Sequence, residues 1–253
     1  MKQIRLDKLL LEKKIVKKLS EVTNLVNEKK IRIPNLNSKF LFEHTLVNIN
    51  SDIKILEKKF VSRGGEKLDK FISEANIIVD NKTCLDVGAS TGGFTDALLQ
   101  RGAKKVYCVD VGKSELNYKI RNNNSVEFFE NINAKYSFNL GLDKLDIIVV
   151  DVSFISVTKI IPQLKIFLSN NSILIILIKP QFEAKKYQID KGGILTNYHL
   201  VPEILDNVIK SAEKNNLSLL SLKKSKIKGR KGNQEFFAMF KTIEILIFFD
   251  SKN

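Results

Sequence analysis

The stretch "CLDVGASTGGFTDALLQRGA" (residues 84–103) contains the residues that decide the fold. Its apolar start predicts a strand, and the residues from about Phe94 onward predict a helix. Between them, Gly88, Gly92 and Gly93 allow a turn in which the backbone approaches a ligand closely. The first amides of the following helix point into the same space. The stretch therefore predicts a strand, turn and helix that bind a nucleotide-like ligand.

The glycine spacing narrows the choice of ligand. A dinucleotide fingerprint would need a glycine at Ser90, and a phosphate-gripping loop would need a Gly-Lys-Ser/Thr sequence that this stretch lacks. Asp110 ends the next predicted strand, 24 positions after Asp86, close to the spacing at which a carboxylate accepts both ribose hydroxyls. This favours S-adenosylmethionine over NAD, with an empty Rossmann-like turn as the alternative. The predicted cofactor-binding residues are Asp86, Gly88, Ala89, Ser90, Gly92, Gly93, Phe94, Asp110, Val111 and Asp151.

Outward from this unit, the sequence alternates between strand and helix patterns. Strands are predicted at residues 83–87, 105–109, 125–129, 145–150, 173–178 and 235–240, with helical stretches between most of them. Such alternation predicts an α/β fold with a Rossmann-like, doubly wound, mostly parallel sheet. In sheets of this kind, ligands collect at the carboxyl ends of the strands.

Three charged residues fall at predicted strand ends. Asp151 follows "LDIIVV", Lys179 follows "SILIILI", and Glu235 opens the last strand. We expect all three at the edge of the sheet that holds the cofactor. There, an amine can take the proton of a hydroxyl that attacks an electrophilic methyl group, while the acids position it. Each charge alone is more often an ordinary strand-end residue, so the prediction depends on their combination with the glycine-rich turn.

The first 60 residues form a separate basic region. They carry fourteen Lys or Arg and seven Asp or Glu, which is half of the net charge of +14. Two helical patterns, at residues 6–10 and 22–26, precede a short strand pattern, "KKIRI". Concentrated charge of this kind is typical of nucleic-acid binding, and the alternative is two ordinary helices with solvated lysines. We predict a small α+β domain at residues 1–60, a linker at 61–66 around Gly64 and Gly65, and a second domain at 67–253.

Composition excludes several other classes of protein. Cys84 and Cys108 lie in apolar surroundings, which predicts reduced core thiols. His44 and His199 lie far apart in the sequence, so no metal site is expected. The longest apolar runs are much shorter than the roughly 20 residues that span a bilayer. With no export signal at the start, the expectation is a cytoplasmic protein with no membrane segment.

Seven strings, in their order along the chain, resemble those of the TlyA or haemolysin-A-like proteins. They are "VSRGGEKL", "CLDVGASTGGFTD", "VYCVDVG", "DVSFIS", "LIKPQFE", "KGGI" and "KGNQEFF", and the similarity runs from Arg5 to about Phe240. This family consists of ribosomal RNA 2'-O-methyltransferases with an FtsJ-like catalytic domain. The resemblance implies S-adenosylmethionine as cofactor, ribosomal RNA as partner, and a cytidine as the target.

The resemblance also implies roles for individual residues. The wider FtsJ-like group uses a Lys-Asp-Lys-Glu tetrad, which here matches Lys67, Asp151, Lys179 and Glu235. Only the resemblance selects Lys67, which otherwise looks like a helix-surface lysine. The first 60 residues would be an RNA-binding domain like that of ribosomal protein S-four. The predicted RNA-binding residues are Arg5, Lys8, Lys17, Lys18, Lys29, Lys30, Arg63, Lys228, Arg230 and Lys231.

Two other functions stay open at this point. One is an RNA-binding assembly factor that keeps the methylation pocket without turnover, although all four tetrad positions are filled. The other is a membrane-lysing haemolysin, but the sequence has no spanning or strongly amphipathic apolar segment.

Overall fold

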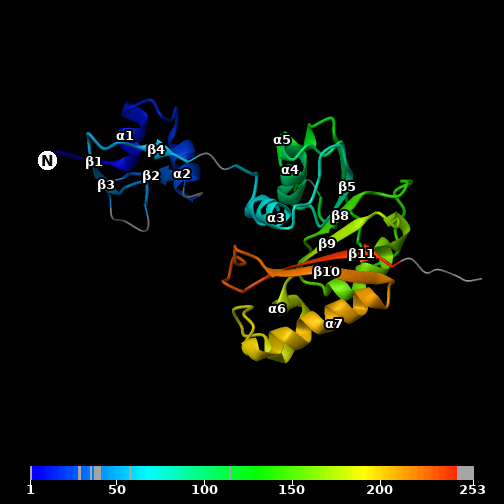
Figure 1. Cartoon of the computed structure of the whole chain (residues 1–253). Helices are drawn as coiled ribbons and strands as arrows, with labels where there is room; N and C mark the ends of the chain where they lie inside the picture. The colour runs from blue at the N-terminus through cyan, green and yellow to red at the C-terminus, as the bar shows by residue number, and fades with distance from the viewer. Residues whose placement is uncertain are drawn as a thin grey trace, which may run out of the picture. The chain divides into compact units, whose positions relative to one another are not determined.

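The computed structural model describes residues 2–27, 30–34, 36, 41–56, 59–113 and 115–243. The chain divides into two compact units, Met1–Lys59 and Phe60–Asn253. Each unit contains buried hydrophobic clusters made of its own residues. Figure 1 shows their secondary structure along the chain.

The first unit is a small α+β structure. It contains the helices α1 (Leu6–Glu12) and α2 (Leu19–Asn27). The strand β1 (Gln3–Arg5) pairs with β3 (Leu46–Asn48), and β2 (Ile31–Arg32) pairs with β4 (Lys54–Ile55), both antiparallel. The buried leucines of α1 follow the predicted helical spacing because that face packs against the core of the unit.

Among its described residues, the second unit is built around a seven-stranded sheet with the order β10-β11-β9-β8-β5-β6-β7. The strands are β5 (Thr83–Val87), β6 (Lys105–Val109), β7 (Val126–Phe129), β8 (Ile147–Val150), β9 (Ile173–Ile178), β10 (Leu217–Lys224) and β11 (Phe236–Thr242). The strands β9, β8, β5, β6 and β7 are parallel to one another, whereas β10 and β11 are antiparallel to their neighbours. The mostly parallel α/β fold predicted from the sequence is confirmed.

Helices cover both faces of this sheet. The α-helices are α3 (Arg63–Glu74), α4 (Gly93–Gln100), α5 (Tyr118–Arg121), α6 (Pro180–Glu183) and α7 (Val201–Glu213). The 3-10 helices are η1 (Val157–Lys159), η2 (Ile161–Phe167), η3 (Lys186–Gln188) and η4 (Tyr198–Leu200).

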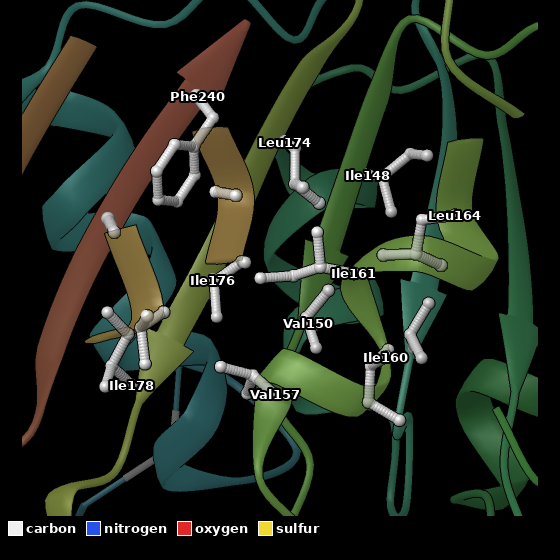
Figure 2. Close-up of a cluster of buried hydrophobic side chains, with 14 of the residues drawn as sticks. Ile148, Val150, Val157, Ile160, Ile161, Leu164, Leu174, Ile176, Ile178 and Phe240 are labelled. Atoms are coloured by element: carbon white, nitrogen blue, oxygen red, sulfur yellow. The ribbon is translucent and has the colours of Figure 1, made fainter. Parts of the chain in front are cut away.

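The central strands are apolar on both faces, which explains their uninterrupted apolar sequences. In β9, Leu174, Ile176 and Ile178 point into a core shared with η1, η2 and α7, part of which is shown in Figure 2. The alternate residues Ile175 and Leu177 belong to the core on the other face, under α3 and α4.

The prediction of a linker at residues 61–66 is wrong, because α3 begins at Arg63, within this range. The Ser62 hydroxyl caps this helix by accepting a hydrogen bond from the Gly64 amide at 3.2 Å. A Cβ atom at Gly65 would lie only 2.5 Å from Phe60 Cβ, and Phe60 is itself buried. The glycine pair therefore allows close packing inside the second unit, where the sequence suggested a joint between domains.

The strand β10 was not predicted. It lies at the edge of the sheet, several of its side chains are exposed, and it ends in two lysines. An edge strand with one solvated face lacks the apolar run that marked the central strands.

Candidate active site

The four predicted catalytic residues come from four separate segments of the second unit, and the structure joins them in two ion pairs. Lys67, on α3, places its Nζ atom 2.6 Å from Glu235 Oε2, just before β11. Lys179, directly after β9, places its Nζ atom 2.7 Å from Asp151 Oδ1, directly after β8. In the sequence, the first pair is separated by 168 positions.

The sheet register brings the two pairs to one edge. Phe236 pairs with Ile178 in the antiparallel β9–β11 ladder, so the next residues outward, Glu235 and Lys179, are opposite each other. Asp151 follows β8, the parallel neighbour of β9. Lys179 and Glu235 are 8% and 3% exposed, respectively. Charges this deeply buried require close partners, and each has one.

The end of β9 fixes the position of Lys179. Pro180 immediately begins α6, because the proline ring suits the first turn of a helix and stops the strand. The lysine also donates a hydrogen bond from Nζ to Ser153 Oγ at 2.9 Å. Its Nζ atom lies 5.7 Å from the ring centroid of Phe182. Sequence reasoning missed Ser153, although the string "DVSFIS" places it two residues after the catalytic aspartate candidate.

Glu183, on α6, holds the loop that follows Asp151. Its Oε1 atom accepts a hydrogen bond from the Val157 amide at 2.9 Å, and Oε2 accepts one from Ser156 Oγ at 2.5 Å. Burial raises the pKa of Glu183, while these two hydrogen bonds act in the opposite direction. The sequence analysis missed this brace, whose partners are 26 or 27 positions apart.

The same loop carries an exposed aromatic side chain. Phe154 is 92% exposed and has a positive φ of 66°, which is unusual for a residue with a bulky side chain. Its ring centroid lies 5.1 Å from that of Phe182. Strained backbone of this kind is held in place by its surroundings and is often found at functional sites.

The glycine-rich turn packs against Asp151, at the edge of the sheet where the two ion pairs lie. Gly88 and Gly92 have positive φ angles of 84° and 87°. A Cβ atom at Gly88 would lie 2.8 Å from the Asp151 carbonyl oxygen, so only glycine allows this approach. Ser90 shares the turn and also has a positive φ. The helix α4 begins at Gly93, one residue before the predicted start at Phe94.

Asp110 lies beside this turn. Its Oδ2 atom accepts a hydrogen bond from the Ser90 amide and its Oδ1 atom one from the Gly112 amide, both at 2.7 Å. These contacts fix the carboxylate, and each oxygen has a second lone pair for another donor. The adjacent Val111 side chain is exposed.

Asp86 is a fully buried carboxyl group under the turn. Its Oδ2 atom accepts hydrogen bonds from the Thr95 amide at 2.9 Å and hydroxyl at 2.7 Å. Within the described part of the chain, its Oδ1 atom has no hydrogen-bond partner. Burial raises the pKa of Asp86 to about 7; the Thr95 hydrogen bonds lower it, and the charges of Asp151 and Asp110 raise it further. A buried acceptor without a partner fits the arrival of a donor from a ligand.

The predicted RNA-binding residues have different surroundings. Lys8, Lys17 and Lys18 are exposed on the first unit, and Lys30 is half-buried there. Arg5 forms an ion pair with Asp7 at 2.6 Å. The prediction for Lys29 lies outside the described residues.

The remaining members of that set belong to the second unit. Arg63 donates a hydrogen bond to the Lys228 carbonyl at 2.6 Å, so it supports the loop between β10 and β11. Lys228, Arg230 and Lys231 are exposed on that loop.

The described helices include none with the length and apolar character needed to cross a membrane. Across residues whose placement is described, no cluster of three His, Cys, Asp or Glu side chains is suited to a metal ion.

Comparisons with known proteins identify the family. Residues 60–242 match the FtsJ-like methyltransferase family. Hemolysin A of Brachyspira hyodysenteriae is 49% identical over 184 residues, covering 72% of this chain and 77% of that protein. The 16S/23S rRNA (cytidine-2'-O)-methyltransferase TlyA of Mycobacterium tuberculosis is 31% identical over 245 residues, covering 95% and 91%. A solved Streptococcus thermophilus structure, named as a hemolysin, has a TM-score of 0.73 at 31% identity and covers 96% of this chain and 90% of that one. The chain belongs to the FtsJ-like methyltransferase family.

Proposed function

We propose that the protein transfers a methyl group from S-adenosylmethionine to the 2'-hydroxyl of a cytidine ribose in ribosomal RNA. The observation that carries this proposal is the pairing of Lys67 with Glu235 and of Lys179 with Asp151 at the sheet edge beside the glycine-rich turn. The choice of RNA and nucleotide is supported by the similarity to TlyA of Mycobacterium tuberculosis, named for this reaction, over 95% of the chain.

The residues around the turn fit the cofactor. Gly88 and Gly92 leave room beside the backbone, and the carboxylate of Asp110 would accept hydrogen bonds from the ribose hydroxyls. The unpartnered Oδ1 atom of Asp86 would accept a hydrogen bond from the amino group of the methionine part. When bound, S-adenosylmethionine supplies an electrophilic methyl group.

The two ion pairs would then have different roles in the reaction with the RNA. Lys179 in its amine form takes the proton of the 2'-hydroxyl at Nζ as that oxygen attacks. Asp151 and Ser153 hold Lys179 in position. The Lys67–Glu235 pair presents an ammonium and a carboxylate that orient the ribose.

The RNA would be held by positive charge and by stacking. Lys8, Lys17 and Lys18 on the first unit are exposed and suited to phosphate contacts. On the second unit, Lys228, Arg230 and Lys231 are exposed four to seven positions before Glu235. The exposed ring of Phe154 offers a face for a base. If ribosomal RNA is the substrate, the protein is expected in the cytoplasm.

The test is to map 2'-O-methyl groups in ribosomal RNA from cells with and without this protein, and to repeat the reaction with purified components. A cytidine that loses its methyl group in the deletion strain, and regains it with the purified protein, is the expected result. Tight RNA binding with no methyl transfer to any ribosomal RNA would contradict the proposal and favour an assembly factor.

A further inference from the structure

Two loops of the second unit lie together beside the Lys67–Glu235 pair. The bridge loop, residues 185–195, follows α6 and is closed by the isolated β-bridge between Ile189 and Leu195. The hairpin loop, residues 225–234, joins β10 to β11. In Figure 1, the yellow bridge loop and the orange hairpin loop extend on the same side of the sheet.

Asn233 joins the two loops. Its Nδ2 atom donates a hydrogen bond to the Gly193 carbonyl at 2.8 Å, and its Oδ1 atom accepts one from the Leu195 amide at 3.2 Å. The Asn233 side chain is buried, so both ends of its amide are used to connect the bridge loop. Lys231 also lies next to Gly193, since a Cβ atom built there would be 3.1 Å from the Lys231 Nζ atom.

The joined loops border the candidate catalytic residues directly. The Gly229 amide donates a hydrogen bond to the Asn233 carbonyl at 2.9 Å, which folds the hairpin loop back on itself. A Cβ atom at Gly229 would lie 2.7 Å from Glu235 Oε1. The backbone of the hairpin loop thus covers the carboxylate that pairs with Lys67.

The charge on these loops is mostly positive. Together with Lys224 at the end of β10, they contain eight Lys or Arg residues and one acidic residue, Asp190. Asp190 Oδ1 accepts a hydrogen bond from the Ile194 amide at 2.8 Å, so this carboxylate serves the turn of the bridge loop. An exposed surface with this excess of positive charge favours a polyanion. The exposed cations are Lys185, Lys186, Lys191, Lys224, Lys226, Lys228, Arg230 and Lys231.

We propose that the bridge loop and the hairpin loop form one binding surface for the phosphate backbone of the RNA strand that carries the target ribose, with Asn233 as the residue that holds the two loops together. The inference rests on the proposed function and adds the bridge loop to it. Seven of the eight cations are lysines, which contact phosphates as point charges and read few bases. The surface therefore supplies affinity and strand position, while the choice of base belongs to other residues.

The first test neutralises two lysines of the bridge loop in the full-length protein. The double variant Lys186→Gln with Lys191→Gln is compared with a control double variant, Lys104→Gln with Lys165→Gln, which removes the same charge. Lys104 and Lys165 precede β6 and β9, so they lie toward the other ends of the parallel strands from the ion pairs. Binding of a ribosomal RNA fragment is measured against salt concentration. For each lost phosphate contact, the slope of log affinity against log salt should fall by about 0.7 to 0.9. KM for RNA should rise several-fold in the bridge-loop variant, with kcat at saturating RNA unchanged.

The second test is Asn233→Ala, which keeps every charge but disconnects the loops. Its RNA affinity should fall while its cofactor affinity and its cooperative melting transition are retained. The inference is overturned if the bridge-loop variant binds RNA with the affinity and salt slope of the control pair, as it would if these lysines contacted an acidic protein. RNA binding is measured without turnover, so wild-type protein that binds RNA through these loops but methylates no ribosomal RNA contradicts the proposed function alone.

Discussion

Lys179 combines burial with two polar contacts, to Asp151 and to Ser153, at the exact point where β9 becomes α6. The sheet fixes its backbone, Pro180 fixes the next residue, and the contacts fix its Nζ atom. A side chain held in this way loses little entropy when it engages a substrate, which is what a proton acceptor in methyl transfer requires.

Replacement of Lys179 tests its role as the proton acceptor. Lys179→Ala should lower the rate of methyl transfer by about 10² to 10⁴. Lys179→Arg should not restore it, because a guanidinium stays protonated. The measurement is single-turnover methylation of ribosomal RNA with saturating cofactor, and Lys104→Arg serves as the control. A Lys179→Arg variant with nearly wild-type rates would mean that the residue acts by its positive charge alone.

Asp110 tests the cofactor assignment. Asp110→Ala removes the carboxylate that we expect to accept the ribose hydroxyls, so S-adenosylmethionine binding should weaken by about 1.5 to 3 kcal/mol. Calorimetry on the folded variant measures this. Unchanged affinity would place the ribose elsewhere.

Asp86 makes stability depend on pH. Its pKa of about 7 in the native state exceeds its ordinary value of 3.8, so the native state holds this proton more tightly than the unfolded chain does. The resulting stability is complete below about pH 4 and is lost as the pH rises towards 7. Asp86→Asn is neutral throughout, so its change in unfolding free energy between pH 4.5 and pH 8 should differ from that of wild type by roughly 1 to 4 kcal/mol in this direction.

Chemical denaturation at both pH values measures the effect. Asp143→Asn, at an exposed carboxylate, is the matched control and should follow wild type. Parallel pH profiles for Asp86→Asn and wild type would show that Asp86 is ionised in the native protein across this range.

The four-residue helix α6 connects the end of β9 to the loop that follows β8. It begins with Pro180, one residue after Lys179, and ends with Glu183, which holds Ser156 and Val157 beyond the other strand end. The loop from Asp151 to Val157 is therefore attached at both ends to the segment that carries the lysine. The relative position of the two strand ends depends on this short helix.

Loss of the brace should affect catalysis more than binding. Glu183→Ala frees the loop, and since small misplacements of catalytic groups are costly, kcat should fall by about 10-fold to 10²-fold. S-adenosylmethionine affinity should change little. Glu183→Gln should recover much of the rate, because its amide oxygen can accept the hydrogen bond from the Val157 amide while its amide nitrogen donates one to the Ser156 hydroxyl. Steady-state kinetics on these variants is the measurement, with exposed Glu203→Ala as control. Equal losses in the Ala and Gln variants would contradict a positioning role.

The elements that could be predicted from sequence are those whose signal is local. The strands β5, β6 and β9 have the bounds expected from their apolar runs, because they are buried on both faces. The start of α3 could not be recognised, since the Gly64–Gly65 pair looks like a joint unless the ring of Phe60 packed against it is known. Likewise, the edge position of β10 depends on β11, which comes later in the chain.

The whole molecule consists of two units with separate cores, and the sequence predicts different tasks for them. Asp151, Lys179 and Glu235 could be chosen from the sequence because strand ends of one sheet meet at one edge. Lys67 required the family resemblance, since a lysine on a helix gives no sign of a partner so far along the chain. The contacts of Asn233 and Glu183 could not be predicted, because they join loops that no periodic pattern describes.

Removal of residues 1–59 tests whether the first unit contributes to RNA binding and the second unit binds the cofactor. The remaining chain keeps the sheet and the glycine-rich turn, so S-adenosylmethionine binding should persist. RNA affinity should fall, and its dependence on salt should become weaker, because the phosphate contacts of the first unit are gone. Calorimetry and RNA binding at several salt concentrations measure the two effects. Identical RNA affinity and salt slope with and without the segment would show that the first unit contributes no phosphate contacts.

The separation of Lys67 from Glu235 has a consequence for synthesis of the protein on the ribosome. During translation, Lys67 leaves the ribosome long before Glu235 has been polymerised, and until then the buried site on α3 lacks its carboxylate. The antiparallel strand β11, added late, closes the pair and completes the sheet beside β9 in the same step. A growing chain can therefore assemble the turn around Gly88 early, but Lys67, Asp151, Lys179 and Glu235 come together only when β11 is in place.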